Sequence, residues 1–182
     1  ITNLNEAPTA IAPGAASVDE NASNGTVVAS LSTTDPDAAQ TFSYQIVSGN
    51  TGNAFAINGS NIVVNGAVNF EGQSSYTLTV RSTDQGGLST TRDIVVSVND
   101  LNEAPTALAL SNDRVNENVA GGTLVATLSS TDQDIADTHT YSIVGGSNDF
   151  EIIGNQLFVK AGAAIAFEAQ SAYPLTIRTT DA

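Results

Sequence analysis

The 182-residue chain contains no Cys, no Met and no Trp, and it has few basic residues. Without Cys it can form no disulfide, zinc–thiolate site, iron–sulfur cluster or thiol nucleophile. No run of about 18 apolar residues occurs, so no segment is expected to insert directly into a membrane as a helix. Stabilisation beyond the hydrophobic core must therefore come from something other than covalent cross-links.

Positive charge is scarce, because 5 Lys and Arg residues stand against 19 Asp and Glu, for a net charge of -14. Such a chain repels phosphate backbones and anionic lipid headgroups. This excludes nucleic-acid binding through a basic patch and electrostatic binding to membranes. Hard metal cations are the partners that this charge favours.

The sequence repeats itself at an offset of 97 residues. Residues 4–10, Leu-Asn-Glu-Ala-Pro-Thr-Ala, recur unchanged as residues 101–107. A fixed period of this kind indicates a tandem array of one structural unit. We therefore predict two repeats, one over residues 1–100 and the other over residues 101–182.

Within each repeat, apolar residues alternate with polar ones, as at Tyr76, Leu78 and Val80. This is the period of a half-buried strand, and Asn-Gly and Gly-Gly dipeptides separate the strand-like stretches. No helical pattern exceeds one turn. About seven short strands in each repeat predict an all-β fold of two tandem, antiparallel Greek-key β-sandwiches of the immunoglobulin-like type.

The end of the first repeat has no counterpart in the second. Residues 86–98 include the alternating Ile94, Val96 and Val98, and nothing equivalent follows Asp181. We expect the second repeat to be C-terminally truncated and to lack its last strand. Its neighbouring strand would then have an open edge, and open edges invite pairing with another chain.

The acidic residues recur at equivalent positions of the two repeats, in loops or at strand ends. Thirteen of the 19 fall in five short motifs: Glu6, Glu20, Asp35, Asp37, Glu71, Asp84, Asp100, Glu103, Glu117, Asp132, Asp134, Glu168 and Asp181. The loops of a sandwich gather at its two poles. Acidic motifs of one repeat can therefore meet those of the next.

Such clusters need a counter-charge. Two carboxylates about 5 Å apart repel by roughly 3 kcal/mol at an effective dielectric constant of about 20. Calcium accepts six to eight oxygen ligands in flexible geometry, whereas magnesium prefers a smaller, more hydrated octahedron and zinc prefers His or Cys. The composition therefore predicts Ca²⁺ as the bound cofactor.

The five motifs occur in the same order in each repeat, and together they resemble the cadherin domain family. In the first repeat they are Glu20-Asn21, Asp35-Pro36-Asp37, Asn69-Phe70-Glu71, the strand ending at Asp84, and the linker Asp100-Leu101-Asn102-Glu103. The Asn-Glu-Ala-Pro style of the linker is similar to cadherin repeats of large bacterial surface adhesins. The resemblance implies calcium-rigidified extracellular adhesion or spacing at a bacterial cell surface, with cadherin-like repeats of the same or neighbouring chains as partners.

The resemblance also implies the ligands. Calcium between the repeats is expected to bind through Glu20, Glu71, Asp100, Asn102, Glu103, Asp132, Asp134 and Asp181. A weaker site is expected at the N-terminal pole, formed by Asn5, Asp35, Asp37 and Asp84. Asn69 stands where the family has Asp, which favours two junction ions over three. The pole with Glu117 and Glu168 keeps too few carboxylates and is expected to hold no ion.

Other functions remain open at this point. Glu20 and Glu71 could be the acid/base pair of a glycosidase, but no nucleophile triad or phosphate-binding glycine loop accompanies them, so no enzyme is expected. His139, the only His, is read as a structural residue at a strand end. The main alternative is calcium-dependent binding of polysaccharide, against which most aromatic residues occur as equivalent pairs at inward positions.

Overall fold

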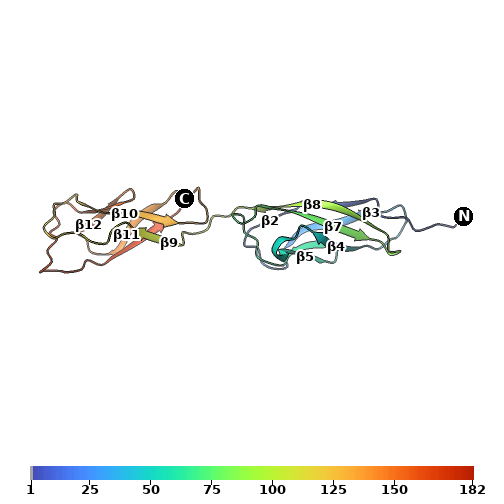
Figure 1. Ribbon diagram of the computed structural model, residues 1–182, viewed down its shortest axis with the longest axis horizontal. Coiled ribbons are helices and arrows are strands. Elements are labelled where there is room, and N and C mark those ends of the chain that lie inside the picture. The colour runs from blue at the N-terminus through green and yellow to red at the C-terminus, as the bar shows by residue number, and fades with distance from the viewer. Residues whose placement is uncertain (1) are drawn as a thin grey trace. The chain divides into compact units, whose positions relative to one another are not determined.

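The computed structural model describes residues 2–182 (Figure 1). The chain divides into two compact units, Ile1–Leu101 and Asn102–Ala182. Each unit is built from short strands joined by turns. Among the described residues the one helical element is a 3-10 turn in the first unit, η1 (Thr51–Asn53). Over residues 2–182, no helix has the length and apolar character needed to cross a membrane.

The first unit is a sandwich of two four-stranded sheets. Its strands are β1 (Ala10–Pro13), β2 (Ser17–Asp19), β3 (Val27–Thr34), β4 (Ser43–Ser48), β5 (Phe55–Asn58), β6 (Asn61–Val64), β7 (Ser75–Thr83) and β8 (Ser89–Asn99). One sheet has the order β1-β3-β6-β5 and the other β2-β8-β7-β4. All pairs are antiparallel except β2 with β8, where Val18 lies opposite Val98 in a parallel pair.

The core of the first unit follows from the alternation along its strands. In β7, Leu78 and Val80 are fully buried, and in β8, Val96 is fully buried. Tyr76 packs edge-on against Phe55 of the opposite sheet, with ring centroids 5.0 Å apart. The inward side chains of the two sheets therefore form one continuous core.

The second unit has six strands: β9 (Ala107–Leu110), β10 (Leu124–Thr131), β11 (Thr140–Gly146), β12 (Phe150–Ile153), β13 (Gln156–Val159) and β14 (Leu175–Thr180). They form a four-stranded sheet, β12-β13-β10-β9, and a two-stranded sheet, β11-β14. Its core cluster of buried apolar residues is smaller and includes Ala126, Leu157 and Val159.

The all-β prediction of two sandwich repeats is confirmed, with strand numbers that differ from the expected seven. The first unit has eight strands because its first strand divides into β1 and β2, which join different sheets. Among the residues described, the second unit has no strand at residues 114–116, the positions equivalent to β2. In the first unit β2 pairs only with β8, and the positions equivalent to β8 in the second repeat would lie beyond residue 182.

Candidate metal centre

Glu20 is a buried carboxylate directly after β2, with 1% of its surface exposed. Its Oε2 accepts a hydrogen bond from the Phe70 backbone N–H at 3.0 Å, and its Oε1 accepts one from the Leu101 N–H at 2.8 Å. The next residue, Asn21, has φ 57°, a left-handed conformation that Asn adopts more readily than most residues. The Glu-Asn motif therefore combines a carboxylate held by two backbone donors with the residue type that its turn requires.

Two further carboxylates meet Glu20 within the first unit. Ligand oxygens of Glu20, Glu71 and Asp100 all lie within 4.8 Å of one another. Oxygens bound to one Ca²⁺ at 2.3–2.6 Å lie at most about 5 Å apart, so this spacing fits a shared ion. The two hydrogen bonds of Glu20 leave lone pairs on both oxygens.

Glu71 is presented by a tight turn. The Asn69 Oδ1 accepts the Gly72 N–H at 2.6 Å, and the Gln73 N–H donates to the Asn69 carbonyl at 3.0 Å. The Asn69 side chain therefore caps the turn that carries Glu71. Asn69 therefore has a structural role in this turn, which an Asp at the same position could also fill.

Polar side chains also gather at the other end of the first unit. The Asn3 amide donates to Asp37 Oδ1 at 2.5 Å, and the Asn5 amide donates to Asp84 Oδ2 at 3.1 Å. The Asp37 N–H donates to Asp35 Oδ1 at 2.9 Å. Asp37 and Asp84 are both buried.

This N-terminal pole differs from the Glu20 cluster in spacing. Among residues 2–182, the carboxylates of Asp35, Asp37 and Asp84 do not form a triad within 4.8 Å, because Asn amides lie against two of them. The Asp35 Oδ2 is buried without a hydrogen-bond partner. The same is true of the Gln40 Oε1, and a cation would satisfy both oxygens.

The second unit begins with an arrangement that repeats this pole. The Glu103 N–H donates to Asp134 Oδ2 at 2.8 Å, as the Glu6 N–H does to Asp37 Oδ2 at the same distance. The Asp134 N–H donates to Asp132 Oδ1 at 3.3 Å. The Asp-x-Asp motif is thus a local turn in both repeats, held by the backbone of the segment that precedes β1 or β9.

Two more predicted ligands belong to this end of the second unit. Asp181 follows β14, and its Oδ2 is buried without a partner. Asn102 is exposed in the segment before β9. The sequence reasoning did not include Asp137, whose Oδ2 is also buried and without a partner. Asp137 occupies the position equivalent to Gln40. The recurrence of an oxygen-bearing side chain at this position of both repeats could have identified the two residues as candidate ligands.

His139 was read as a structural residue, and the structure adds a contact that this reading missed. Its Nε2 lies 3.0 Å from Asp132 Oδ2, and both side chains are largely buried. The pKa of Asp132 is lowered from its usual 3.8, first by the hydrogen bond with His139 and also by the Asp134 N–H, against burial, which raises it. Phe42 stands at the equivalent position of the first repeat.

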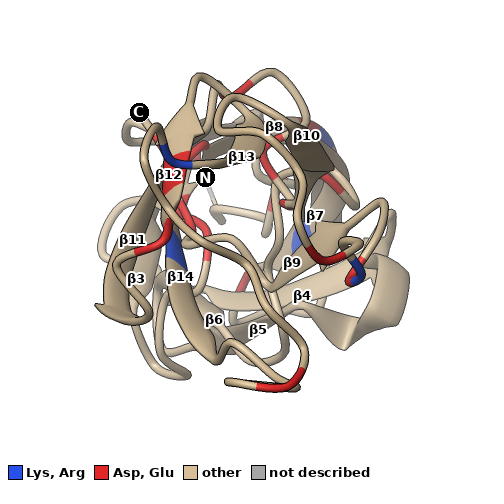
Figure 2. Cartoon of the chain, turned by 90° about the vertical axis from the view of Figure 1, so that its left-hand side faces the viewer, with Lys and Arg blue, Asp and Glu red and all other residues tan. Residues whose placement is uncertain are grey.

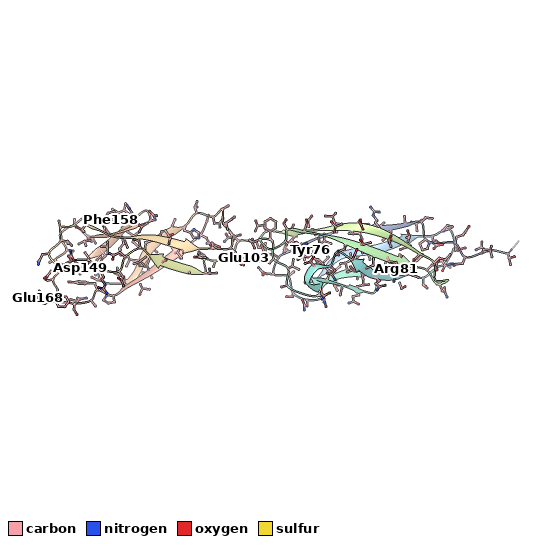
Figure 3. The ribbon with its side chains drawn as sticks, in the orientation of Figure 1. Tyr76, Arg81, Glu103, Asp149, Phe158 and Glu168 are labelled. Atoms are coloured by element: carbon pink, nitrogen blue, oxygen red, sulfur yellow. The ribbon has the colours of Figure 1, made fainter. Side chains whose placement is uncertain are left out.

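The remaining acidic pole of the second unit is more open. Glu117 and Glu168 are both exposed, and Glu117 retains only the hydrogen bond from the Phe167 N–H, at 3.3 Å. Figure 3 places Glu168 and Glu103 at opposite ends of the second unit. Along the sequence, Lys and Arg are few beside Asp and Glu (Figure 2).

Comparison with known proteins bears on these clusters. Residues 15–99 match the family model described as "Cadherin domain". The chain is 30% identical over 181 residues to the protocadherin-like wing polarity protein stan of Drosophila melanogaster. This alignment covers 91% of the chain and 5% of the Drosophila protein. It is 38% identical over 154 residues to mouse protocadherin Fat 4, covering 72% of this chain and 3% of that protein.

Solved structures share the fold at lower identity. The EC1-2 fragment of human protocadherin-24 matches with a TM-score of 0.71 and 20% identity, over 97% of this chain and 87% of that one. The EC22-24 fragment of mouse cadherin-23 matches with a TM-score of 0.68 and 21% identity, over 91% of this chain and 56% of that one.

These relatives are extracellular adhesion-type repeats rather than enzymes, and cadherin domains are generally calcium-binding. The Glu20 cluster fits that chemistry, because three carboxylates converge beside a buried, doubly hydrogen-bonded glutamate. Residues 15–99 thus belong to the cadherin domain family, and the internal repeat extends the same sandwich to the second unit.

Proposed function

We propose that this chain is a pair of calcium-binding cadherin-like repeats that acts as a rigidified adhesion or spacer module. The observation that carries the proposal is the convergence of Glu20, Glu71 and Asp100 within 4.8 Å. The chain carries a net charge of -14, with 5 Lys and Arg residues against 19 Asp and Glu. A divalent cation removes the mutual repulsion.

The second acidic set supports the same function. Asp134 accepts the Glu103 N–H and donates its own N–H to Asp132, while Asp181 directly follows β14. Asn102 and Glu103 lie in the segment before β9. Only Leu101 separates Asp100 from Asn102 in the sequence. We infer that both sets contribute ligands to the same two ions and that these ions stiffen the linker.

The N-terminal pole of the first unit is the site of a further, weaker ion in this proposal. Asn5, Asp35, Asp37 and Asp84 supply its side-chain oxygens. Each Asn amide that now donates to a carboxylate can turn by 180° and present its oxygen to a cation. The partnerless oxygens of Asp35 and Gln40 favour this rearrangement.

A place on a bacterial cell surface rests on the Asn-Glu-Ala-Pro linker style, since the relatives named above are animal proteins. The chain spans only 5% of the stan protein and 3% of Fat 4. The partners that we propose are calcium and other cadherin-like repeats. Polysaccharide binding receives no support, because Phe167 is the one exposed residue among the ten aromatics.

Calcium titration of a matched pair of variants tests the proposal. Glu71→Gln removes one exposed ligand charge from the triad, whereas Asp93→Asn removes an exposed charge of β8 whose partner is the Thr79 hydroxyl. Isothermal calorimetry should show the Glu71 variant binding at least about tenfold more weakly at one site. Unchanged affinity in Glu71→Gln, or an equal loss in Asp93→Asn, would contradict the assignment.

A further inference from the structure

Three hydroxyl groups from both sheets meet inside the first unit. The Thr33 Oγ1 of β3 donates to the Tyr44 Oη of β4 at 2.9 Å and lies 2.8 Å from the Ser82 Oγ of β7. β3 belongs to one sheet, whereas β4 and β7 are neighbours in the other. Ser82 is fully buried, and Thr33 and Tyr44 are half-buried. We call Thr33, Tyr44 and Ser82 the hydroxyl bridge of the first unit, because their hydrogen bonds join the two sheets.

The second unit contains the same hydroxyl bridge at the equivalent positions, 97 residues further along the chain. The Ser130 Oγ donates to the Tyr141 Oη at 3.2 Å and lies 2.7 Å from the Thr179 Oγ1. Thr and Ser have exchanged strands, since the first unit has Thr on β3 and Ser on β7, whereas the second has Ser on β10 and Thr on β14. Each pair keeps two hydroxyls and one methyl group, so the hydrogen bond and the volume of the pair are both retained.

A hydrogen bond at this place does something that apolar packing does not. An apolar pair of the same volume would fill the space without burying polar groups, and the net stability that a neutral hydrogen bond adds is small. A hydrogen bond between hydroxyls, however, holds two oxygen atoms at roughly 2.8 Å and in a preferred orientation. The hydroxyl bridge therefore fixes how far the two sheets stand apart at this point of the sandwich.

The hydroxyl bridge lies two residues before the acidic strand ends. Asp35 follows Thr33 by two positions, and Asp84 follows Ser82 by two positions. Residues two apart in an extended chain point to the same side and lie about 7 Å from each other. The two hydroxyls are thus the last inward-facing groups of β3 and β7 before these carboxylates. The same two-residue step leads to the acidic strand ends of the second unit.

The carboxylates at these strand ends repel each other when no ion lies between them. Asp84 is buried, and the Asp35 Oδ2 is buried without a hydrogen-bond partner. A Ca²⁺ ion needs its oxygen ligands close together, because each lies only about 2.3–2.6 Å from the ion. A contact that holds the strand ends in place before the ion arrives therefore removes part of the cost of binding.

We propose that the hydroxyl bridge of each unit is a positioning device for calcium. In the first unit it holds Asp35 and Asp84 at the spacing that the N-terminal ion requires, although no hydroxyl of the bridge contacts that ion. In the second unit it does the same for Asp132 and Asp181. The inference rests on the proposed function, because it requires an ion at each of these acidic ends. Calcium affinity then depends on buried residues whose own oxygens are not ligands.

Removing one hydroxyl at a time from β7 tests the proposal. Ser82→Ala deletes only the oxygen of a buried side chain. Thr79→Val is the matched control, because the Thr79 hydroxyl donates to Asp93 on the opposite, outward face of the same strand. Thermal unfolding in chelator measures the structural cost of each variant when no ion is bound.

Calcium titrations of the full 182-residue chain, followed by amide NMR, measure the two ends of the first unit separately. The Asp37 and Leu88 N–H groups donate to carboxylates of the N-terminal pole, and we call them the N-terminal reporters. The Phe70 and Leu101 N–H groups donate to Glu20 at the other end, and we call them the Glu20 reporters. Each pair gives the affinity of its own end of the unit.

Ser82→Ala should weaken the calcium affinity at the N-terminal reporters by about fivefold, which corresponds to the loss of one net hydrogen bond. The affinity at the Glu20 reporters should stay the same, and Thr79→Val should change neither affinity. A hydroxyl bridge with a structural role alone would lower the unfolding temperature of Ser82→Ala in chelator and leave both affinities unchanged. That result would overturn the proposal, as would an equal loss at both pairs of reporters.

A second variant keeps the test independent of one substitution. Thr33→Val preserves the shape of its side chain and should give the same selective loss as Ser82→Ala. Calcium-dependent shifts of the N-terminal reporters in the parent chain, with unchanged affinity in both variants, would refute the positioning role alone. A parent chain without such shifts would refute the ion at this pole, and the positioning role with it.

Discussion

The two repeats differ most beside β8, whose equivalent positions in the second repeat would lie beyond residue 182. Val18 is 5% exposed and Tyr76 is 6% exposed, whereas their equivalents Val115 and Tyr173 are only partly buried. The acidic pole changes in the same direction, from the buried Glu20 to the exposed Glu117.

One strand thus organises both the core and the carboxylate cluster. β8 covers the core with alternate side chains, and the Leu101 N–H just beyond it holds Glu20 Oε1. The Glu20 N–H in turn donates to the Asn99 carbonyl at 3.1 Å. Burial of Glu20 therefore depends on the end of β8 as much as on the Glu20-Asn21 motif.

The largest expected effect comes from breaking β8 itself. Val96→Asp places a charge at a fully buried position and should destabilise the first unit by about 3 kcal/mol or more. Val95→Asp, on the exposed face, should cost about 1 kcal/mol or less. Urea unfolding followed by circular dichroism measures both, and similar midpoints for the two variants would show that β8 does not close this core.

Equivalent acidic residues should differ in their importance for calcium. Glu71 and Glu168 occupy the same position in the two repeats, but only Glu71 belongs to a carboxylate triad among the described residues. Glu168→Gln should leave every calcium affinity unchanged, in contrast to the loss of about tenfold or more expected for Glu71→Gln. A calorimetric loss for Glu168→Gln would show that the second unit has a comparable site at its far pole.

The Glu-Asn turns of the two repeats have the same left-handed backbone conformation at Asn. Asn21 has φ 57° and Asn118 has φ 59°. Replacing either by Ala should cost about 1–2 kcal/mol, because a Cβ without a compensating polar group disfavours this conformation. Gly at the same positions should cost less. Thermal unfolding in chelator tests this, and an Ala variant as stable as the Gly variant would contradict the backbone explanation.

The smallest effect concerns the His139 contact, which has no counterpart in the first repeat. The pKa of Asp132 is depressed first by its hydrogen bond with His139. A carboxyl with a depressed pKa contributes stability that is present above about pH 4 and lost as the pH falls through the lowered value. His139→Phe should raise the pKa of Asp132 toward 3.8, measured by carboxyl NMR titration in chelator. An unchanged pKa would show that the Asp134 N–H carries the shift.

Much of the fold could be predicted because its signals are local. The alternation at Tyr76, Leu78 and Val80 indicates strands, and the repeat offset indicates two units. The division of the first strand and the absence of a β2 equivalent could not be predicted in this way. Both depend on which sheet a short segment joins, and that choice is made by distant partners such as β8.

The acidic motifs were predicted from their recurrence, and the structure brings three of them together at Glu20, Glu71 and Asp100. Their recurrence did not indicate which carboxylate is buried, because burial of Glu20 depends on backbone donors far away in sequence. Gln40 and the His139 contact were missed for a related reason. Neither belongs to one of the recurring acidic motifs. Gln40 is identified by its buried oxygen without a hydrogen-bond partner, and His139 by its contact with the Asp132 carboxylate.

The parallel pairing of β2 with β8 also bears on mechanical force. One strand lies near the start of the first unit and the other near its end, so tension between these ends pulls the two strands along their length in opposite directions. The hydrogen bonds between residues 17–19 and residues 97–99 are then loaded together in shear rather than opened one after another. The first repeat should therefore resist tension between its two ends through hydrogen bonds that act together.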